Sequence, residues 1–200
     1  SAMSVAAGYG EYMLAVTSSH FGSAEKEFRF PLGYASQRPL SASWTVTGSG
    51  AFLVGRQKSH VRITGVTVGK IVDYGLKDSQ NMGACMAPAA ADTILTNLKD
   101  FGRSPTSYDR IITGDLGYIG QSILLRDRHL DCGMKIFDQE KQDTHAGGSG
   151  CGCAAVTLSA YILPKIQRGE WKRVLFVPTG ALMSTVSYNE GASVPGIAHG

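Results

Sequence analysis

Apolar residues occur along this chain in short uninterrupted runs bounded by glycine, serine and threonine. The runs at residues 12–16 and 51–54 have such boundaries on both sides and are typical of buried strands. Residues 61–68 are rich in β-branched side chains and alternate in part, which predicts a third strand. Short apolar strands are also expected at residues 110–113 and 173–177.

Two other segments carry the helical period. Residues 88–101 place apolar side chains on one face, with a proline at the start and Gly102 after the end. A second helix is expected over residues 150–168, with Pro164 bending it or lying near its exposed end, and with Gly169 stopping it. Its expected buried stripe comprises Val156, Ser159, Ile162, Leu163 and Ile166. Strands and helices that alternate with short loops predict an α/β protein with a mixed sheet.

Two distant stretches follow the same plan. Residues 6–19 and 166–180 each show a helix end, Gly-Glu-aromatic, an apolar strand and a threonine-bearing turn. Either the match is chance, or it indicates a duplicated unit. In the second case the chain carries the end of a first copy and most of a second.

Composition and charge bound the class of protein. Two hundred residues with 43% hydrophobic side chains suit one globular domain, or two small ones packed together. The net charge is only +3 and the basic residues are scattered, which argues against nucleic-acid binding. No run approaches the roughly 18 apolar residues of a spanning helix. Nothing resembles a signal peptide, so the four cysteines are expected to be free thiols.

The stretch "HAGGSGCGCAAV" at residues 145–156 is open to three interpretations: a metal clip, a nucleophile turn or a helix start. No fourth ligand completes a zinc site around Cys151 and Cys153, so small buried thiols are favoured. Gly147 and Gly148 remove side chains, letting backbone amides turn inward, and Ser149 can cap the helix. Bare amides at a helix start suit an anion. The stretch therefore predicts a tight packing turn that also faces an anionic ligand.

Three further side chains are candidate ligand contacts. Arg29 stands between Phe28 and Phe30, so it offers a guanidinium fork for a carboxylate beside aromatic rings; a surface loop is the alternative. His20 ends the first strand, where it either faces a ligand or is structural. Asp115 follows the strand at 110–113, and either coordinates calcium or caps a turn.

Seven motifs, taken in order, carry a family resemblance: "LAVTSSH", "TVTGSGAFLV", "MAPAAADTI", "TGDLG", "AGGSGCGCAAV", "PTGAL" and "IAHG". Together they resemble the stage V sporulation protein AD family, thiolase-like proteins of spore-forming bacteria. The resemblance implies a thiolase-like fold, a duplicated βαβαβαββ unit layered αβαβα, of which this is a partial chain. Residues 1–55 would finish the first half, and residues 56–200 would form most of the second, with its last strand truncated.

The resemblance also implies a function. The family is associated with dipicolinic acid, which enters the spore as its calcium chelate. We therefore expect a dipicolinate-binding protein with no cofactor of its own, calcium entering only as the chelate. Expected partners are dipicolinic acid, membrane proteins of the same spore-loading system and a second copy in a homodimer. The expected location is peripheral, on the cytoplasmic face of the spore inner membrane in the forespore.

Catalysis is not expected. Condensing enzymes place a histidine or asparagine where Ala146–Ser149 stand here, another histidine near Gly114 and Asp115, and thiolases a second cysteine near Pro178 and Thr179. None of these groups is present, and His145 is shifted from the first position. The expected contacts of the ligand are His20, Arg29, Asp115, Gly147, Gly148, Ser149 and Cys151, with no metal site. The alternative is an active condensing enzyme whose cysteine nucleophile lies upstream of this sequence.

Overall fold

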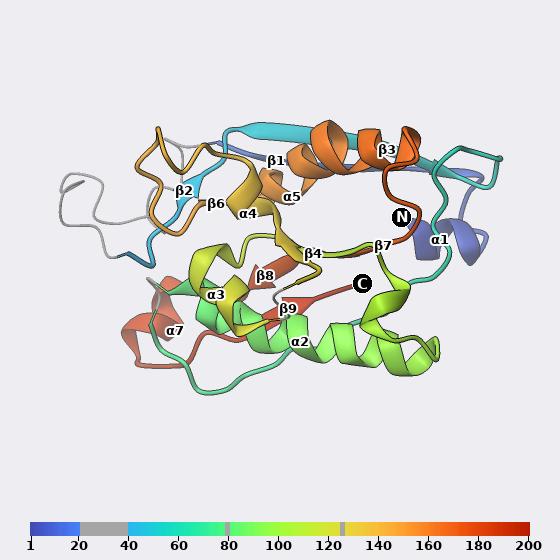
Figure 1. Ribbon diagram of the computed structural model, residues 1–200. Helices are drawn as coiled ribbons and strands as arrows, with labels where there is room; N and C mark the ends of the chain where they lie inside the picture. Colours follow the sequence, from blue (N-terminus) through green and yellow to red (C-terminus); the bar gives the residue numbers. More distant parts are fainter. Residues whose placement is uncertain (21–39, 79–80, 125–126) are drawn as a thin grey trace.

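The protein is a layered α/β structure (Figure 1). The computed structural model describes residues 1–20, 40–78, 81–124 and 127–200. The first layer is an antiparallel pair of β1 (Tyr12–Ser19) and β3 (Gly48–Gly55). The α/β class expected from the sequence is confirmed, but the mixed sheet is not: among the described residues, each sheet is either wholly parallel or wholly antiparallel.

The central layer is a parallel sheet of order β5-β4-β7. Strand β4 (Arg110–Thr113) lies in the middle, with β5 (His129–Asp131) and β7 (Val174–Val177) as its neighbours. A helix that begins with α5 (Cys151–Thr157) packs between this sheet and the β1–β3 pair, and α2 (Met82–Asp100) covers the opposite face (Figure 1).

The shorter elements complete the chain. They are α1 (Ala2–Ala6), β2 (Trp44–Thr45), a 3-10 turn (Pro105–Ser107), α3 (Gly117–Ile123), α4 (Cys132–Lys135), β6 (Gly148–Ser149), β8 (Thr179–Ala181), α7 (Thr185–Asn189) and β9 (Gly196–Ala198). Strand β2 pairs in parallel with β6, and β8 pairs antiparallel with β9. Among the described residues, none of the helices combines the length and apolar character needed to cross a membrane.

Two hydrophobic clusters lie on opposite faces of β4, because successive side chains of a strand point to opposite sides. Ile111 belongs to a cluster with Met86 of α2 and Leu175 of β7. Its neighbour Ile112 belongs to the other cluster, with Cys153 of α5. The strand predicted at residues 110–113 is confirmed to the residue, and the one predicted at residues 173–177 starts one residue later.

The strand predicted at residues 61–68 is wrong. These residues have no regular structure, although Thr67 exchanges two backbone hydrogen bonds with Gly200 (2.5 and 3.0 Å). Further along the chain, Val72 forms an isolated antiparallel bridge with Gly196 of β9. The β-branched residues of this segment therefore accompany the C-terminal strand as extended chain without building a ladder of their own.

The helix predicted at residues 88–101 starts six residues earlier. Asn81 caps α2 by accepting the Ala84 amide (3.3 Å), and Pro88 lies inside the helix. Helices α2 and α3 meet at glycines: a Cβ on Gly83 would lie 2.0 Å from the Leu116 carbonyl oxygen. The Asn81 cap, not the proline, marks this helix start.

The helix predicted at residues 150–168 is confirmed with a change of register. A π-helical segment (Leu158–Ile162) separates α5 from α6 (Leu163–Gln167). Pro164 cannot donate a helical hydrogen bond, and such a wide turn before a proline relieves the missing bond. The buried side therefore steps by five from Thr157 to Ile162, and Ser159, predicted to be buried, is exposed.

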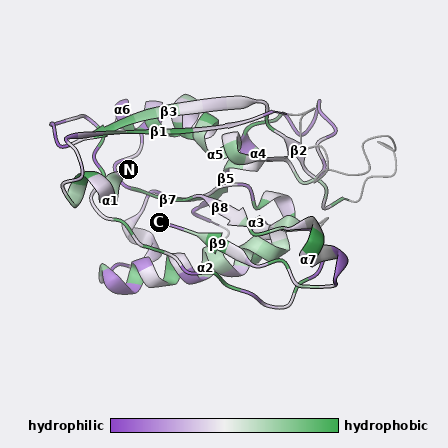
Figure 2. Cartoon of the chain, turned by 180° about the vertical axis from the view of Figure 1, so that it is seen from behind, coloured by the Kyte–Doolittle hydropathy of each residue, from purple (hydrophilic) through white to green (hydrophobic). Residues whose placement is uncertain are grey.

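The outer face of the β1–β3 pair is apolar and exposed, although both strands were predicted to be buried. Leu14 and Leu53 lie opposite each other in register, and their side chains are 65% and 68% exposed. Val16 is 63% exposed beside them. Figure 2 shows hydrophobic residues along much of both strands. Within the part of the chain that the structure describes, α5 packs against the inner face of this pair.

Candidate functional site: a polar cluster around Asp115

Three segments that are distant in sequence, two turns and strand β6, meet at the carboxyl end of the central sheet. Strands β4 and β7 are parallel neighbours, so the turns that follow them lie at the same edge. The first turn carries Asp115 and the second carries Thr179. The third contributor is β6, whose Ser149 directly precedes the start of α5. Binding sites in α/β proteins commonly lie at this edge.

The Asp115 carboxylate is the centre of the cluster. Its Oδ2 accepts hydrogen bonds from the Ser149 hydroxyl (2.6 Å) and the Gly150 amide (3.1 Å). Its Oδ1 accepts the Thr179 hydroxyl (3.0 Å), and the Asp115 amide donates to Thr179 Oγ1 (3.1 Å). Asp115 is half-buried, so part of the carboxylate faces solvent. Asp115 thus joins the other two segments and does not cap its own turn, whose Leu116 and Gly117 amides donate to Asp131; the role in calcium coordination stays a prediction.

The prediction of bare amides in the glycine loop is wrong. The Gly150 amide donates to Asp115, the Gly147 amide to the Thr144 carbonyl (2.9 Å), and the Gly152 amide to Ser19 Oγ (2.8 Å). A carboxylate of the protein itself thus takes the place at which an outside anion was expected. Two amides at this helix start, those of Gly150 and Gly152, are therefore already bonded within the protein.

Gly147 and Gly148 are buried, and close packing explains why they are glycines. A Cβ on Gly147 would lie 2.6 Å from the Gly133 carbonyl oxygen, and its φ is +100°. A Cβ on Gly148 would lie 2.4 Å from Ile136 Cγ2. The predicted tight packing turn is confirmed, while contact of these two residues with a ligand stays a prediction.

The end of β1 lies beside the start of α5. The Thr17 hydroxyl donates to the Cys151 carbonyl (2.9 Å), and Ser19 holds the Gly152 amide. His20 follows and is exposed at this end of the strand. Of the predicted ligand contacts, Asp115, Ser149, Cys151 and His20 therefore occupy one region. Arg29 lies outside the described residues.

The four cysteines are free, and their burial differs. Cys85, Cys132 and Cys153 are buried, whereas Cys151, also predicted to be buried, is exposed. Burial raises the pKa of the Cys85 and Cys132 thiols, which makes them still less reactive. No group of three or more potential metal-ligating side chains occurs within the described part of the chain.

We expect one thiol to react rapidly with Ellman's reagent in the folded protein, since only the thiolate of an exposed cysteine is accessible. The Cys151→Ser variant should lose this fast phase, and the three other thiols should react only in denaturant. A fast phase that survives in Cys151→Ser would contradict the burial of the other cysteines.

A buried hydrogen-bonded chain behind Asp115 escaped the sequence analysis. Thr113 and Asp131 are cross-strand neighbours on β4 and β5, and His129 shares their face. The Thr113 hydroxyl donates to Asp131 Oδ2 (2.6 Å) and lies 2.8 Å from His129 Nε2. Alternation along β5 could have shown that His129 and Asp131 share a face, but not that the face is buried.

Burial shifts both titratable groups of this chain toward their neutral forms. It raises the pKa of Asp131 to about 7, against the opposing effect of the hydrogen bonds that the carboxylate accepts. It lowers the pKa of His129 to about 4. Near neutral pH the histidine is therefore uncharged and the aspartate is close to its titration midpoint.

His145 lies in the loop before β6 and contacts a side chain of the same loop. It has a positive φ of 48°, and its Nε2 lies 2.9 Å from Asp143 Oδ1. This contact joins the ring to its own loop. That this histidine is shifted from a catalytic position stays a prediction.

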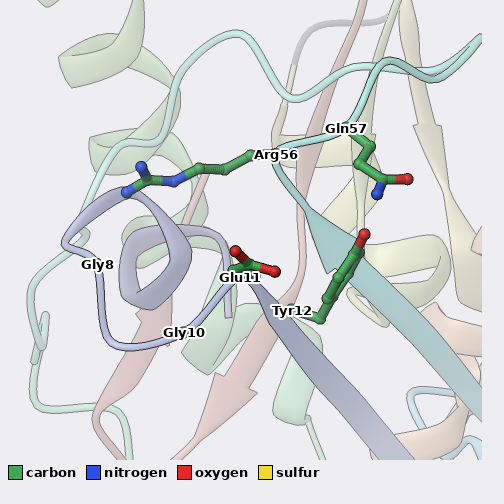
Figure 3. Close-up of a pocket in the computed structure, with 6 residues that line it drawn as sticks. All are labelled: Gly8, Gly10, Glu11, Tyr12, Arg56 and Gln57. Carbon is green, nitrogen blue, oxygen red and sulfur yellow. The ribbon is translucent and has the colours of Figure 1, made fainter.

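A shallow pocket of about 450 Å³ lies elsewhere, between the end of α1 and the ends of β1 and β3 (Figure 3). Its lining includes Glu11, Tyr12 and Arg56. The Arg56 guanidinium donates to the Val5 carbonyl (2.9 and 3.2 Å) at the end of α1. Arg56 thus caps a helix, and the Asp115 cluster remains the stronger candidate site.

The fold and the cluster define a layered α/β protein with a candidate binding site at the carboxyl end of its parallel sheet. A family model described as Stage V sporulation protein AD (SpoVAD) matches residues 1–200, and the chain belongs to this family. It is 43% identical over 203 residues to Stage V sporulation protein AD of Bacillus subtilis (strain 168). That alignment covers 96% of this chain and 60% of the relative, so the chain spans about 60% of the relative's length.

Proposed function

We propose that this sporulation protein is a non-catalytic, thiolase-like protein that binds dipicolinic acid and supports its uptake into the developing spore. The observation that carries the proposal is the hydrogen bonding of Ser149 and Thr179 to Asp115. These bonds join the three segments in which condensing enzymes and thiolases carry their catalytic groups. In this protein the three segments carry hydrogen-bonded polar side chains instead.

The order of layers supports the thiolase-like part of the proposal. Sheet β1–β3, helix α5, the central sheet and helix α2 follow one another as in four layers of an αβαβα stack (Figure 1). The repeated plan supports a duplicated unit: Gly8 and Gly169 both have positive φ, 83° and 76°, between a helix end and an apolar strand. The proposed boundary between the halves lies after residue 55, at the end of β3.

The charge of the cluster favours one form of the ligand. Free dipicolinate is a dianion at neutral pH, and Asp115 would repel it. Its calcium chelate is neutral, and Ca²⁺ takes six to eight oxygen ligands, so a chelated ion still has open positions. A single carboxylate can occupy one of these open positions. The described residues contain no group of three or more side chains that could bind calcium without the chelate. We therefore propose that Asp115 contacts the calcium of the chelate.

Titration calorimetry tests this function. The full-length protein should bind calcium dipicolinate more tightly than dipicolinate with a chelator, and should bind neither calcium alone nor benzoate measurably. In Asp115→Asn, the ratio of the affinity for calcium dipicolinate to the affinity for free dipicolinate should fall about tenfold, which is the effect expected for one charged contact. Equal binding of benzoate, or no binding of any dipicolinate form at millimolar concentration, would defeat the proposal. An acyl group transferred from acyl-CoA to the protein would support an enzyme instead.

We also propose that this chain forms a homodimer through the exposed face of β1 and β3, the face on which the fifth layer of an αβαβα stack would lie. Leu14 and Leu53 would pack against a second copy, and the face they share with Val16 carries no charge. We expect the double variant Leu14→Thr, Leu53→Thr to weaken self-association in sedimentation velocity while retaining its far-ultraviolet circular dichroism. Unchanged association would contradict this interface. Peripheral attachment to membrane proteins of the spore-loading system, on the inner membrane of the forespore, completes the proposal.

A further inference from the structure

One buried carboxylate holds both flanks of the residue at the centre of the site. Asp131 Oδ2 accepts the Thr113 hydroxyl (2.6 Å) and the Leu116 amide (2.9 Å), and Oδ1 accepts the Gly117 amide (3.0 Å). Thr113 precedes Asp115 by two residues, and the two amides follow it directly. The Asp131 side chain is 1% exposed, so water does not compete for these bonds.

We propose that Asp131, which stays buried throughout, is a proton-operated latch for the turn that carries Asp115, closed when Asp131 is ionised and open when it is protonated. An ionised carboxylate only accepts hydrogen bonds, and here it accepts three from one turn and its preceding strand. Bonds to a charged acceptor are stronger than bonds to a neutral one. Proton uptake therefore weakens the bonds on both sides of Asp115 at once.

The hydrogen-bonded side chains of Thr113 and His129 provide a partner for the added proton. When Asp131 Oδ2 carries a proton, it can donate to Thr113 Oγ1, and the Thr113 hydroxyl can turn to donate to His129 Nε2. The imidazole must then carry its own proton on Nδ1. The net change is one proton taken up from solvent. Because Oδ2 has become a hydroxyl oxygen, the Leu116 amide loses its charged acceptor.

The surroundings of Asp131 determine the direction of this response. His129 faces it from β5 through Thr113, Asp115 faces it from the turn, and the Cys132 thiol adjoins it at α4. Lys135 of α4 is exposed at the other end of that helix. The described groups that face Asp131 therefore bring no positive charge, and the Asp115 carboxylate favours proton uptake. Together with burial, this places the pKa of Asp131 at about 7.

Nuclear magnetic resonance of the protein between pH 5.5 and 8.5 tests the latch. The amide resonances of Leu116 and Gly117 should titrate together with a midpoint near 7, and the Asp131 carboxyl carbon should titrate with them. The Gly150 amide, which donates to Asp115, should be about tenfold better protected from hydrogen exchange at pH 8 than at pH 6, the size expected for one lost charged hydrogen bond. These measurements need no ligand, so they are independent of the function proposed above.

Two variants separate a latch from a merely structural contact. Asp131→Asn should abolish the shared titration and keep Gly150 at its low protection throughout. Asp109→Asn is the matched control, because Asp109 also accepts two consecutive amides, from Lys172 (2.6 Å) and Arg173 (2.9 Å), at an exposed site. It should leave the titration unchanged. If Leu116 and Gly117 do not titrate in the native protein, or still titrate in Asp131→Asn, the latch is overturned; the native titration alone decides should this variant not fold.

Discussion

Replacing Asp131 with asparagine is expected to make the stability of the protein rise with pH between about 4 and 6.5, where the native protein should be nearly insensitive. Two opposite linkages explain this result. His129 has its pKa lowered in the folded state, so the unfolded chain binds more protons in this range and stability rises with pH. Asp131 has its pKa raised, so the folded state binds more protons and stability falls with pH up to about 7.

The native protein carries both effects, and they nearly cancel. Without Asp131 only the effect of His129 remains. Its pKa falls from 6.5 to about 4 on folding, so the free energy of unfolding should rise by about 3 kcal/mol between pH 4 and 6.5. His129→Gln should show the reverse, a loss of similar size that continues to pH 7. Free energies of unfolding from urea titrations at pH 4, 5.5, 6.5 and 7.5 measure these slopes. Asp109→Asn should follow the native curve, and equal slopes for the two buried-site variants would contradict the assignment.

Gly147→Ala is expected to destabilise the protein by about 2 to 6 kcal/mol. The backbone at this residue has φ of +100°, which costs a non-glycine residue about 1 to 3 kcal/mol. The new methyl group would also lie 2.6 Å from the Gly133 carbonyl oxygen, and overpacking of this kind costs about 1 to 3 kcal/mol more. The free energy of unfolding in urea measures the sum.

Two glycines serve as controls for the separate causes. Gly102 has a positive φ of 57° and open space around it, so Gly102→Ala should cost only about 1 kcal/mol. Gly180 has neither feature, and a Cβ there would meet Ile197 at an ordinary 3.6 Å, so Gly180→Ala should stay within about 0.5 kcal/mol. If Gly147→Ala is no worse than Gly102→Ala, the close approach of the glycine loop to Gly133 is not a real constraint.

Local patterns predicted the secondary structure where packing agreed with them. Strand β4 is four residues bounded by turn formers, and the helical period over residues 150–168 is visible despite Pro164 in α6. The segment at 61–68 has the composition of a strand but pairs mainly at one residue, Thr67, and composition does not reveal pairing. The π-helical segment also has no sequence signal beyond the proline, so Ser159 was wrongly assigned to the buried stripe, whereas Ile162 was assigned to it correctly.

For the site, the sequence predicted the members of the cluster better than their contacts. Asp115 and Ser149 were candidates, and their segments do meet. The sequence did not show that Asp115 accepts the hydrogen bond of the Gly150 amide. The two residues are 35 positions apart, and no local pattern encodes such a contact. Asp131 was missed for the same reason: an aspartate at a strand end is usually exposed, and only the cover of α3 and α4 makes it buried.

The measurement that tests the central claim most directly is a map of the ligand on the protein. Isotope-labelled protein is titrated with calcium dipicolinate, and amide shift changes are assigned. We predict the largest changes in residues 114–117, 149–152 and 179–180, the three segments that meet at Asp115, and their loss in Asp115→Asn. Saturable changes centred on other residues, such as the pocket beside Arg56, with none at Asp115, would contradict the account.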